Sequence, residues 1–122
     1  MNAYYKTCAV PKPGNARKRK KQNGWKGKAE RVCAYDGTPN AERHEVFGGP
    51  LRQISIDRGF RVDVSQRRHA ELHANATEWA RAENLRLKRF FQAKFEAEFI
   101  AEGLGADEAR EAWMRMMGRN WL

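Results

Sequence analysis

The chain has 122 residues, the length of one small domain, and 24 basic against 15 acidic residues give it a formal net charge of +9. No apolar run approaches the roughly 18 residues that a membrane-spanning helix needs, and the first residues lack the pattern of a secretory signal. Two cysteines, Cys8 and Cys33, are too few for a disulfide framework. These totals argue against a membrane protein or a disulfide-rich secreted domain and fit a reducing cytosol.

The positive charge is concentrated at the N-terminus. Residues 1–28 hold nine of the 24 basic residues and no acidic residue, so residues 29–122 are balanced at 15 of each sign. The first segment is also rich in glycine and proline and poor in apolar residues, which predicts a flexible, disordered basic arm (1–28) before a folded domain (29–122). Such an arm either aids solubility or neutralises nucleic-acid phosphates. We favour the second role, because dense like charges without acids need an anionic partner. The densest run is Arg17, Lys18, Arg19, Lys20 and Lys21.

The folded part begins with strand signals. "RVCAYDGT" (31–38) alternates in polarity and ends in Asp36-Gly37, which predicts a strand followed by a hairpin turn. "AERHEVF" (41–47) is the expected return strand, and Gly48-Gly49-Pro50 then opens a loop. Residues 51–59 are expected to be a loop or a short turn of helix that Gly59 ends.

A third strand and three helices follow. "FRVDV" (60–64) has the alternation of a half-buried strand, and Ser65 is a good N-cap for a helix to about Ala76. Thr77 is expected to cap a longer helix with one apolar stripe, formed by Leu87, Phe91, Phe95 and Phe99. Glycines 103 and 105 end that helix, and residues 107–117 predict another before the closing "GRNWL". Strands followed by helices predict an α+β fold, with the apolar stripes as core.

The three histidines of the chain suggest a metal site. His69 and His73 in "HAELH" are four residues apart, so a helix places them on one face. His44 lies near the end of a predicted strand that comes before this helix. Two surface histidines at this spacing are common, but together the three predict a site for one divalent cation. Imidazole ligands suit Zn, Ni, Co or Mn, whereas Mg would need Glu45 or water.

The order of these motifs resembles the HNH, or ββα-metal, endonucleases, and above all the small HNH-like proteins of bacteriophages. The residues that carry the resemblance are "CAYDG", "RHEVFGG", Arg52, Ser55, Gly59, His69, His73 and "GRNWL". It covers residues 31–122. The resemblance implies a ββα-metal core with added C-terminal helices, and a metal-dependent DNA endonuclease that acts in recombination or DNA processing. It also implies a location in the cytoplasm of a bacterial host, and phage or host recombination proteins as partners.

The resemblance further implies roles for individual residues. His44, His69 and His73 would hold one divalent metal ion (Mg, Mn, Zn or Ni), and either Glu45 or His44 would activate water. Arg52 and the basic run at residues 17–21 would bind DNA phosphates. Both His44 and Glu45 can serve one site only if the strand twists or bulges, because successive strand residues point to opposite faces.

The chain departs from the family pattern at three places. Glu45 occupies the position where these nucleases usually have a histidine base, and no asparagine lies between it and His69, so Asp57 or Gln53 would have to orient the base. Asn75 is a further polar residue close to the histidine helix. Asp36 replaces the second cysteine of the family's zinc knuckle, so we expect no zinc held by cysteines.

Two other function classes remain open. The same scaffold with its base replaced would be a DNA-binding accessory protein that does not cleave, with Trp25 stacking on exposed bases. A helical protein that binds another protein would leave the histidines idle. Cleavage separates the first two classes, and metal content separates them from the third.

Overall fold

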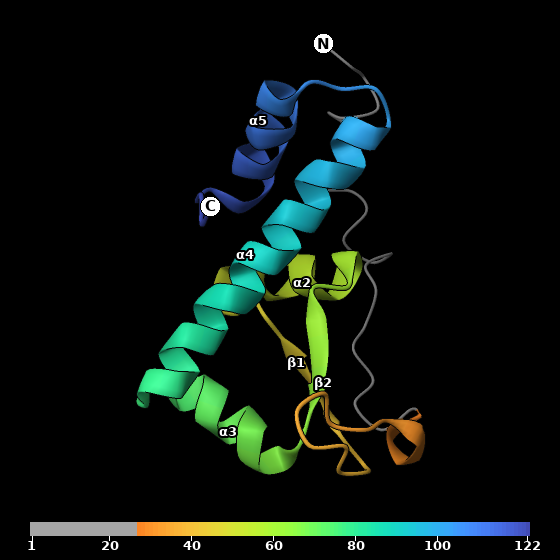
Figure 1. Ribbon diagram of the computed structural model, residues 1–122, viewed down its shortest axis with the longest axis vertical. Helices are drawn as coiled ribbons and strands as arrows, with labels where there is room; N and C mark the ends of the chain where they lie inside the picture. Colours follow the sequence, from red (N-terminus) through yellow and green to blue (C-terminus); the bar gives the residue numbers. More distant parts are fainter. Residues whose placement is uncertain (1–26) are drawn as a thin grey trace. The chain divides into compact units, whose positions relative to one another are not determined.

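The computed structural model describes residues 27–122, which form four α-helices, two short 3-10 helices and one two-stranded antiparallel sheet (Figure 1). Their contacts divide this part of the chain into two units, residues 27–87 and residues 88–122, and helix α4 (Glu78–Ala101) belongs to both. The expected α+β class is confirmed. None of the helices in this part of the chain is long and apolar enough to cross a membrane. The basic run at residues 17–21 and most of the predicted arm lie outside the described residues.

The sheet pairs two strands that are separated by a helix. Strand β1 (Glu42–Glu45) is antiparallel to β2 (Arg61–Val64), with Glu42 opposite Val64 and His44 opposite Val62. The expected strand over 60–64 is therefore confirmed, whereas the expected pairing of 31–38 with 41–47 is wrong. Between those two segments the amide of Ala41 donates to the carbonyl of Arg31 at 3.2 Å, and an isolated bridge between Val32 and Pro39 closes the turn before the second segment begins.

The segment over 31–38 forms a tight turn instead of a strand. The Asp36-Gly37 turn is present, since the amide of Gly37 donates to the carbonyl of Cys33 at 2.9 Å. The Cys33 amide also donates to the carbonyl of Thr38 at 2.9 Å. The chain therefore reverses within residues 33–38, which leaves too few residues for a strand ladder with 41–47. The amide of Ala34 donates to the carbonyl of Asp63 at 2.9 Å, so this loop lies along β2. The local hairpin signal was correct, but β2 takes the place of the expected partner strand.

The connection from β1 to β2 holds a short 3-10 helix, η3 (Gly49–Leu51), followed by α2 (Arg52–Arg58). Gly59 ends α2 in the left-handed conformation, at φ 74°, which is the end expected for this segment. Ser55 of α2 is fully buried, and its hydroxyl bonds both backbone groups of Phe47. It accepts from the amide of Phe47 at 3.0 Å and donates to the carbonyl at 2.8 Å. Ser55 thus fixes the chain just after β1.

We expect Ser55→Ala to lower the free energy of unfolding by about 2–3 kcal/mol, because it leaves a buried amide and a buried carbonyl without their shared partner. Urea denaturation followed by circular dichroism measures this change. Arg58→Ala is the matched control on the exposed surface of the same helix. A loss for Ser55→Ala no larger than that of the control would contradict this role.

Helix α3 (Gln66–Ala74) packs against both strands. Ser65 caps it as expected, since the Ser65 hydroxyl accepts from the amide of Arg68 at 3.2 Å. A small core between α3 and the sheet contains Cys33, Val64 and Leu72, with Tyr35, Val62 and Trp79 packed around it. This packing fixes α3 against β1, and so places the histidines of the two elements.

A polar cluster joins the 31–38 loop to the first turns of α4. The Tyr35 hydroxyl donates to the carboxylate of Glu83 at 2.6 Å, and Arg86 forms two hydrogen bonds with the same carboxylate. The bonds from Arg86 lower the pKa of Glu83, whereas burial, followed by the nearby Glu83 carboxylate, raises the pKa of Tyr35. At neutral pH the phenol is therefore neutral and the carboxylate charged, which suits the bond between them.

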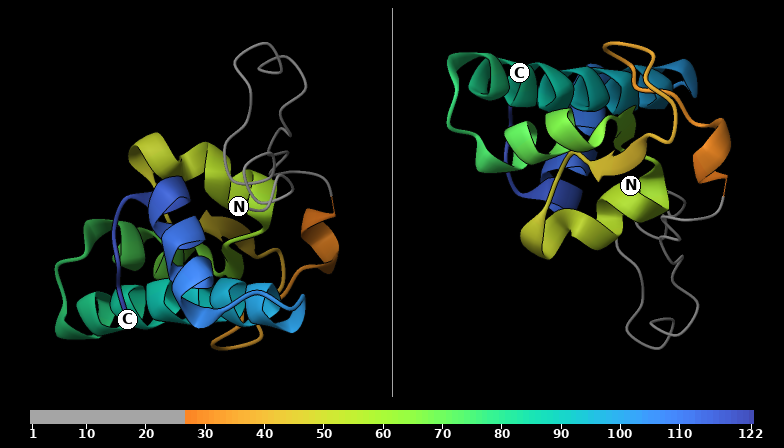
Figure 2. Two further views of the ribbon diagram at one scale, coloured as in Figure 1. Left: turned by 90° about the horizontal axis from the view of Figure 1, so that it is seen from above. Right: turned by 90° about the horizontal axis from the view of Figure 1, so that it is seen from below.

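The unit formed by residues 88–122 has its own aromatic core. Helix α5 (Ala106–Met117) lies alongside the C-terminal part of α4 (Figure 2). Trp113 of α5 is fully buried, and its ring lies 5.5 Å from that of Phe95, measured between centroids. Phe91, Phe95 and Phe99 are each less than 10% exposed. The apolar stripe expected on this helix is thus confirmed as core.

Candidate metal centre

Strand β1 presents two potential site residues on one face. Side chains alternate along a strand, so Glu42 and His44 share a face and Arg43 and Glu45 share the other. The contacts agree with this alternation: Glu42 bonds His69 of α3, and Glu45 bonds Arg52 of α2. His44 is only 4% exposed.

Helix α3 supplies the other two imidazoles. His69 and His73 are one turn apart, and their Nε2 atoms lie 3.0 Å from each other. His69 is partly buried, and His73 is exposed. The spacing of the "HAELH" motif therefore brings two ring nitrogens to one point at the surface of the helix.

The three histidines meet in the structure. The ring centroid of His44 lies 5.3 Å from that of His69 and 5.3 Å from that of His73. One ring nitrogen from each lies within 4.8 Å of the other two, and among the described residues this is the one group of this kind. The convergence expected from the sequence is confirmed. Burial increases from His73 to His44, so the group is closed at the strand and open at the helix.

The donor set fits a divalent cation. Metal–imidazole bonds are about 2.0–2.1 Å long, which puts two nitrogens on one cation about 3.0–3.4 Å apart. The 3.0 Å between the Nε2 atoms of His69 and His73 lies in this range. The His44 nitrogen lies within 4.8 Å of the other two, so it must approach them by no more than the difference from this range to bind the same cation. Three neutral imidazoles leave further coordination positions for water or a phosphate oxygen.

Glu42 orients one of the three rings, and the sequence analysis did not identify it. The Glu42 carboxylate lies 2.8 Å from Nδ1 of His69, where it accepts a hydrogen bond from the N–H of the Nδ1 tautomer. The Nε2 lone pair of His69 then points toward His73, as a ligand requires. The signal that could have found Glu42 is its position two residues before His44, on the same face of the strand.

We expect Glu42→Ala to weaken binding of Zn²⁺ or Ni²⁺ by about 10–100-fold, because the His69 ring loses the partner that fixes its orientation. Glu42→Gln is expected to lie between this variant and the wild type, since its amide oxygen still accepts the bond without a charge. Competition with a chromophoric chelator measures the affinity. The control is Glu30→Ala, which removes an exposed carboxylate from the same unit. Equal affinities for Glu42→Ala and Glu30→Ala would contradict this role for Glu42.

Glu45 lies outside the group of three histidines. Its carboxylate accepts a hydrogen bond from Nε of Arg52 at 2.9 Å. The side chain of Glu45 is 11% exposed, whereas that of Arg52 is 59% exposed. Glu45, the predicted base, and Arg52, the predicted phosphate ligand, therefore bind each other beside β1. Their catalytic and DNA-binding roles remain predictions.

The candidates for orienting the base occupy other positions. Gln53 and Asp57 bond each other along α2, at 2.9 Å. Asn75 ends α3 in the left-handed conformation, and its side-chain oxygen accepts a hydrogen bond from Asn84 at 2.9 Å. Asp36, at the position of the missing cysteine, bonds Thr38 within the turn.

Basic side chains gather near the face of β1 that carries Glu45. The pKa of Arg43 is lowered by burial first, and then by the neighbouring positive charges of Arg61 and Arg31. Asp63 and Glu45 offset this repulsion only in part. The local field on this side of the sheet is therefore positive and favours an anionic ligand.

Comparisons with protein-family models, with curated proteins and with solved structures found no match to this chain.

Proposed function

We propose that the protein is a metal-dependent DNA endonuclease of the HNH, or ββα-metal, type that acts in phage DNA recombination or processing. The observation that carries this proposal is the convergence of His44, His69 and His73 within 4.8 Å. The order of the elements supports it. An antiparallel strand pair is followed directly by a helix, and ligands come from the first strand and from the helix.

His44, His69 and His73 would hold the cation, with Glu42 fixing the ring of His69. A bound divalent cation supplies Lewis-acid stabilisation of the negative charge that develops on the phosphate and the leaving oxygen. The exposed side of the group, at His73, leaves room for a phosphodiester to approach. All three imidazoles are then ligands, so none is left to act as the base.

Glu45 is the remaining candidate for the base that the sequence suggests. Because Glu45 lies on the face of β1 opposite to His44, this role requires that the end of the strand, just before Gly48-Gly49, turns its carboxylate toward the cation. The carboxylate then accepts the proton of the attacking water once Arg52 has turned toward a phosphate. The exposure of Arg52 permits this exchange, because its guanidinium group reaches solvent while it still bonds Glu45. The positive surroundings formed by Arg31, Arg43 and Arg61 hold the DNA backbone close to this pair.

Nicking of supercoiled plasmid tests the proposal. Purified protein is incubated with plasmid in EDTA and, separately, with Mg²⁺, Mn²⁺, Zn²⁺ or Ni²⁺. We expect open circles with at least one metal and none in EDTA. A double variant, His69→Ala with His73→Ala, purified in the same way, controls for a contaminating nuclease.

The alternative is a DNA-binding accessory protein that does not cleave. The ion pair between Glu45 and Arg52 favours this alternative, because the carboxylate must first release the hydrogen bond from Arg52 before it can accept a proton from water. Metal-loaded protein that binds plasmid but never nicks it would support the accessory role and overturn the endonuclease.

A further inference from the structure

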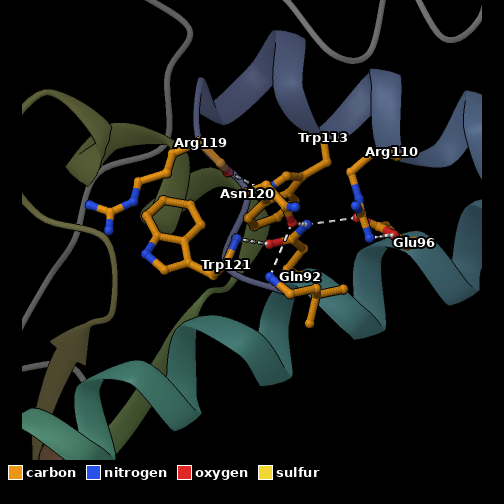
Figure 3. Close-up of polar contacts among 8 residues, drawn as sticks. Gln92, Glu96, Arg110, Trp113, Arg119, Asn120 and Trp121 are labelled. Carbon is orange, nitrogen blue, oxygen red and sulfur yellow. Dashed lines mark hydrogen bonds and ion pairs between the residues drawn. The ribbon is translucent and has the colours of Figure 1, made fainter.

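The last residues of the chain are fastened to α4 by a buried glutamine. The amide of Trp121 donates to Oε1 of Gln92 at 2.7 Å, and Nε2 of Gln92 donates to the side-chain oxygen of Asn120 at 2.8 Å (Figure 3). Gln92 is fully buried. The Trp121 carbonyl accepts from Nε of Arg89 at 2.8 Å. Both backbone polar groups of Trp121 are thus bonded to α4, which fixes the position of its indole.

Two cations lie near this indole, and a third lies at the backbone carbonyl of Trp121. The Nζ atom of Lys88 lies 5.7 Å from the ring centroid, and the guanidinium carbon of Arg119 lies 5.4 Å from it, within range of a cation–π interaction. Figure 3 shows the Arg119 side chain beside the Trp121 indole. Arg89 completes the group at the Trp121 carbonyl. We call Lys88, Arg89 and Arg119 the tail cation cluster.

Among residues 27–122, no side-chain carboxylate forms an ion pair with the tail cation cluster. The ion pairs of that part of the chain do not involve Lys88, Arg89 or Arg119. Other arginines of the same unit are paired: Arg110 with Glu96, and Arg115 with Glu111. Lys88, Arg89 and Arg119 therefore form a group of neighbouring cations that no ion-paired acid accompanies in this unit.

The cluster carries an electrostatic cost that an anion would relieve. Burial, and then the positive charge of Arg119, lower the pKa of Lys88. Lys88 is half-buried, while Arg89 and Arg119 are exposed, so an incoming anion can reach the charged groups. Like charges held together by a fixed indole and a bonded backbone form a ready-made anion site.

We propose that the tail cation cluster binds backbone phosphates of DNA, as a contact separate from the metal centre. The choice of DNA rests on the proposed function, which makes a phosphodiester chain the substrate. Guanidinium groups match phosphate oxygens bidentately, and a duplex supplies closely spaced phosphates for several cations at once.

The salt dependence of DNA binding tests the proposal. Fluorescence anisotropy with a labelled 20-bp duplex, in EDTA and at 50–200 mM salt, compares two double variants. Lys88→Gln with Arg119→Gln removes two cluster charges, and Lys94→Gln with Arg115→Gln removes two other charges from the exposed surface of the same unit. Arg89 is left unchanged because it holds the Trp121 carbonyl.

We expect the slope of log K against log salt to become shallower by about 2 in the cluster variant, since each lost phosphate contact changes it by about 1. The control variant is expected to change it by less than half as much. Equal slopes in the two variants would overturn the proposal. Polyglutamate, added at the same total charge as the duplex, tests a protein partner. If it displaced the duplex from the wild type and not from the cluster variant, the ligand of the cluster would be an acidic protein and not DNA.

A measurement on the wild type does not depend on the folding of a variant. In NMR spectra of the full chain, the indole N–H of Trp121 and the Nε–H of Arg119 are expected to shift on addition of the duplex in EDTA. Unchanged resonances would overturn the proposal. Neither experiment involves metal or cleavage, so a protein that fails to nick DNA can still confirm the cluster, and one that nicks DNA can still refute it.

Discussion

Replacing His73 by alanine is expected to lower the affinity for Zn²⁺ or Ni²⁺ by roughly 100-fold or more and to abolish metal-dependent nicking. Changes in residues that only orient a ligand already cost about 10–100-fold, and His73 is itself one of the three ligands. Because His73 is exposed, its loss removes little packing. The variant should therefore unfold at nearly the wild-type urea concentration, which separates the loss of function from a loss of fold.

The matched control for this variant is Gln66→Ala, an exposed neutral position on the same helix. It should bind metal and nick plasmid as the wild type does. Full nicking activity in His73→Ala would exclude the proposed centre. Loss of nicking with unchanged metal affinity would place the metal elsewhere in the chain.

Replacing Glu45 by glutamine is expected to slow nicking by about 10²–10⁴-fold, the usual contribution of a general base. Metal affinity should change by less than about threefold, because Glu45 bonds Arg52 and lies outside the group of histidines. Stability should change by no more than about 1 kcal/mol, since Arg52 is largely exposed. Single-turnover nicking at saturating metal measures the rate.

Two control variants interpret this result. Glu30→Gln removes an exposed carboxylate of the same unit and should leave the rate unchanged. Arg52→Gln removes the hydrogen bond from Arg52 to Glu45 and a phosphate contact, so it should weaken DNA binding more than it slows the saturated rate. A wild-type rate in Glu45→Gln would show that Glu45 serves only as the partner of Arg52.

The sequence was sufficient for the features that depend on local chemistry. Ser65 caps α3 and Gly59 ends α2, because a hydroxyl acceptor and a left-handed residue are needed at those positions whatever the rest of the fold. The i, i+4 spacing of His69 and His73 likewise brings two rings together on any helix. These features needed no knowledge of the tertiary structure.

Strand pairing was beyond the sequence, because alternation shows that a segment can be a strand and not which strand it joins. Both 31–38 and 60–64 alternate in polarity, and the hairpin turn at Asp36-Gly37 favoured the nearer segment. The structure pairs β1 with β2 instead. The role of Glu42 could not be predicted either, because it depends on where α3 packs against β1. The tail cation cluster forms because the last residues pack against α4. No local pattern in "GRNWL" predicts that contact.

The central claim is that three imidazoles bind one divalent cation. The chain has only three histidines, so NMR of their ring resonances during a Zn²⁺ titration follows every candidate imidazole ligand at once. The account predicts that the rings of His44, His69 and His73 all shift together and stop shifting at one equivalent of Zn²⁺. It would be contradicted if the His44 ring stayed unchanged while the other two shifted, or if none of the three responded.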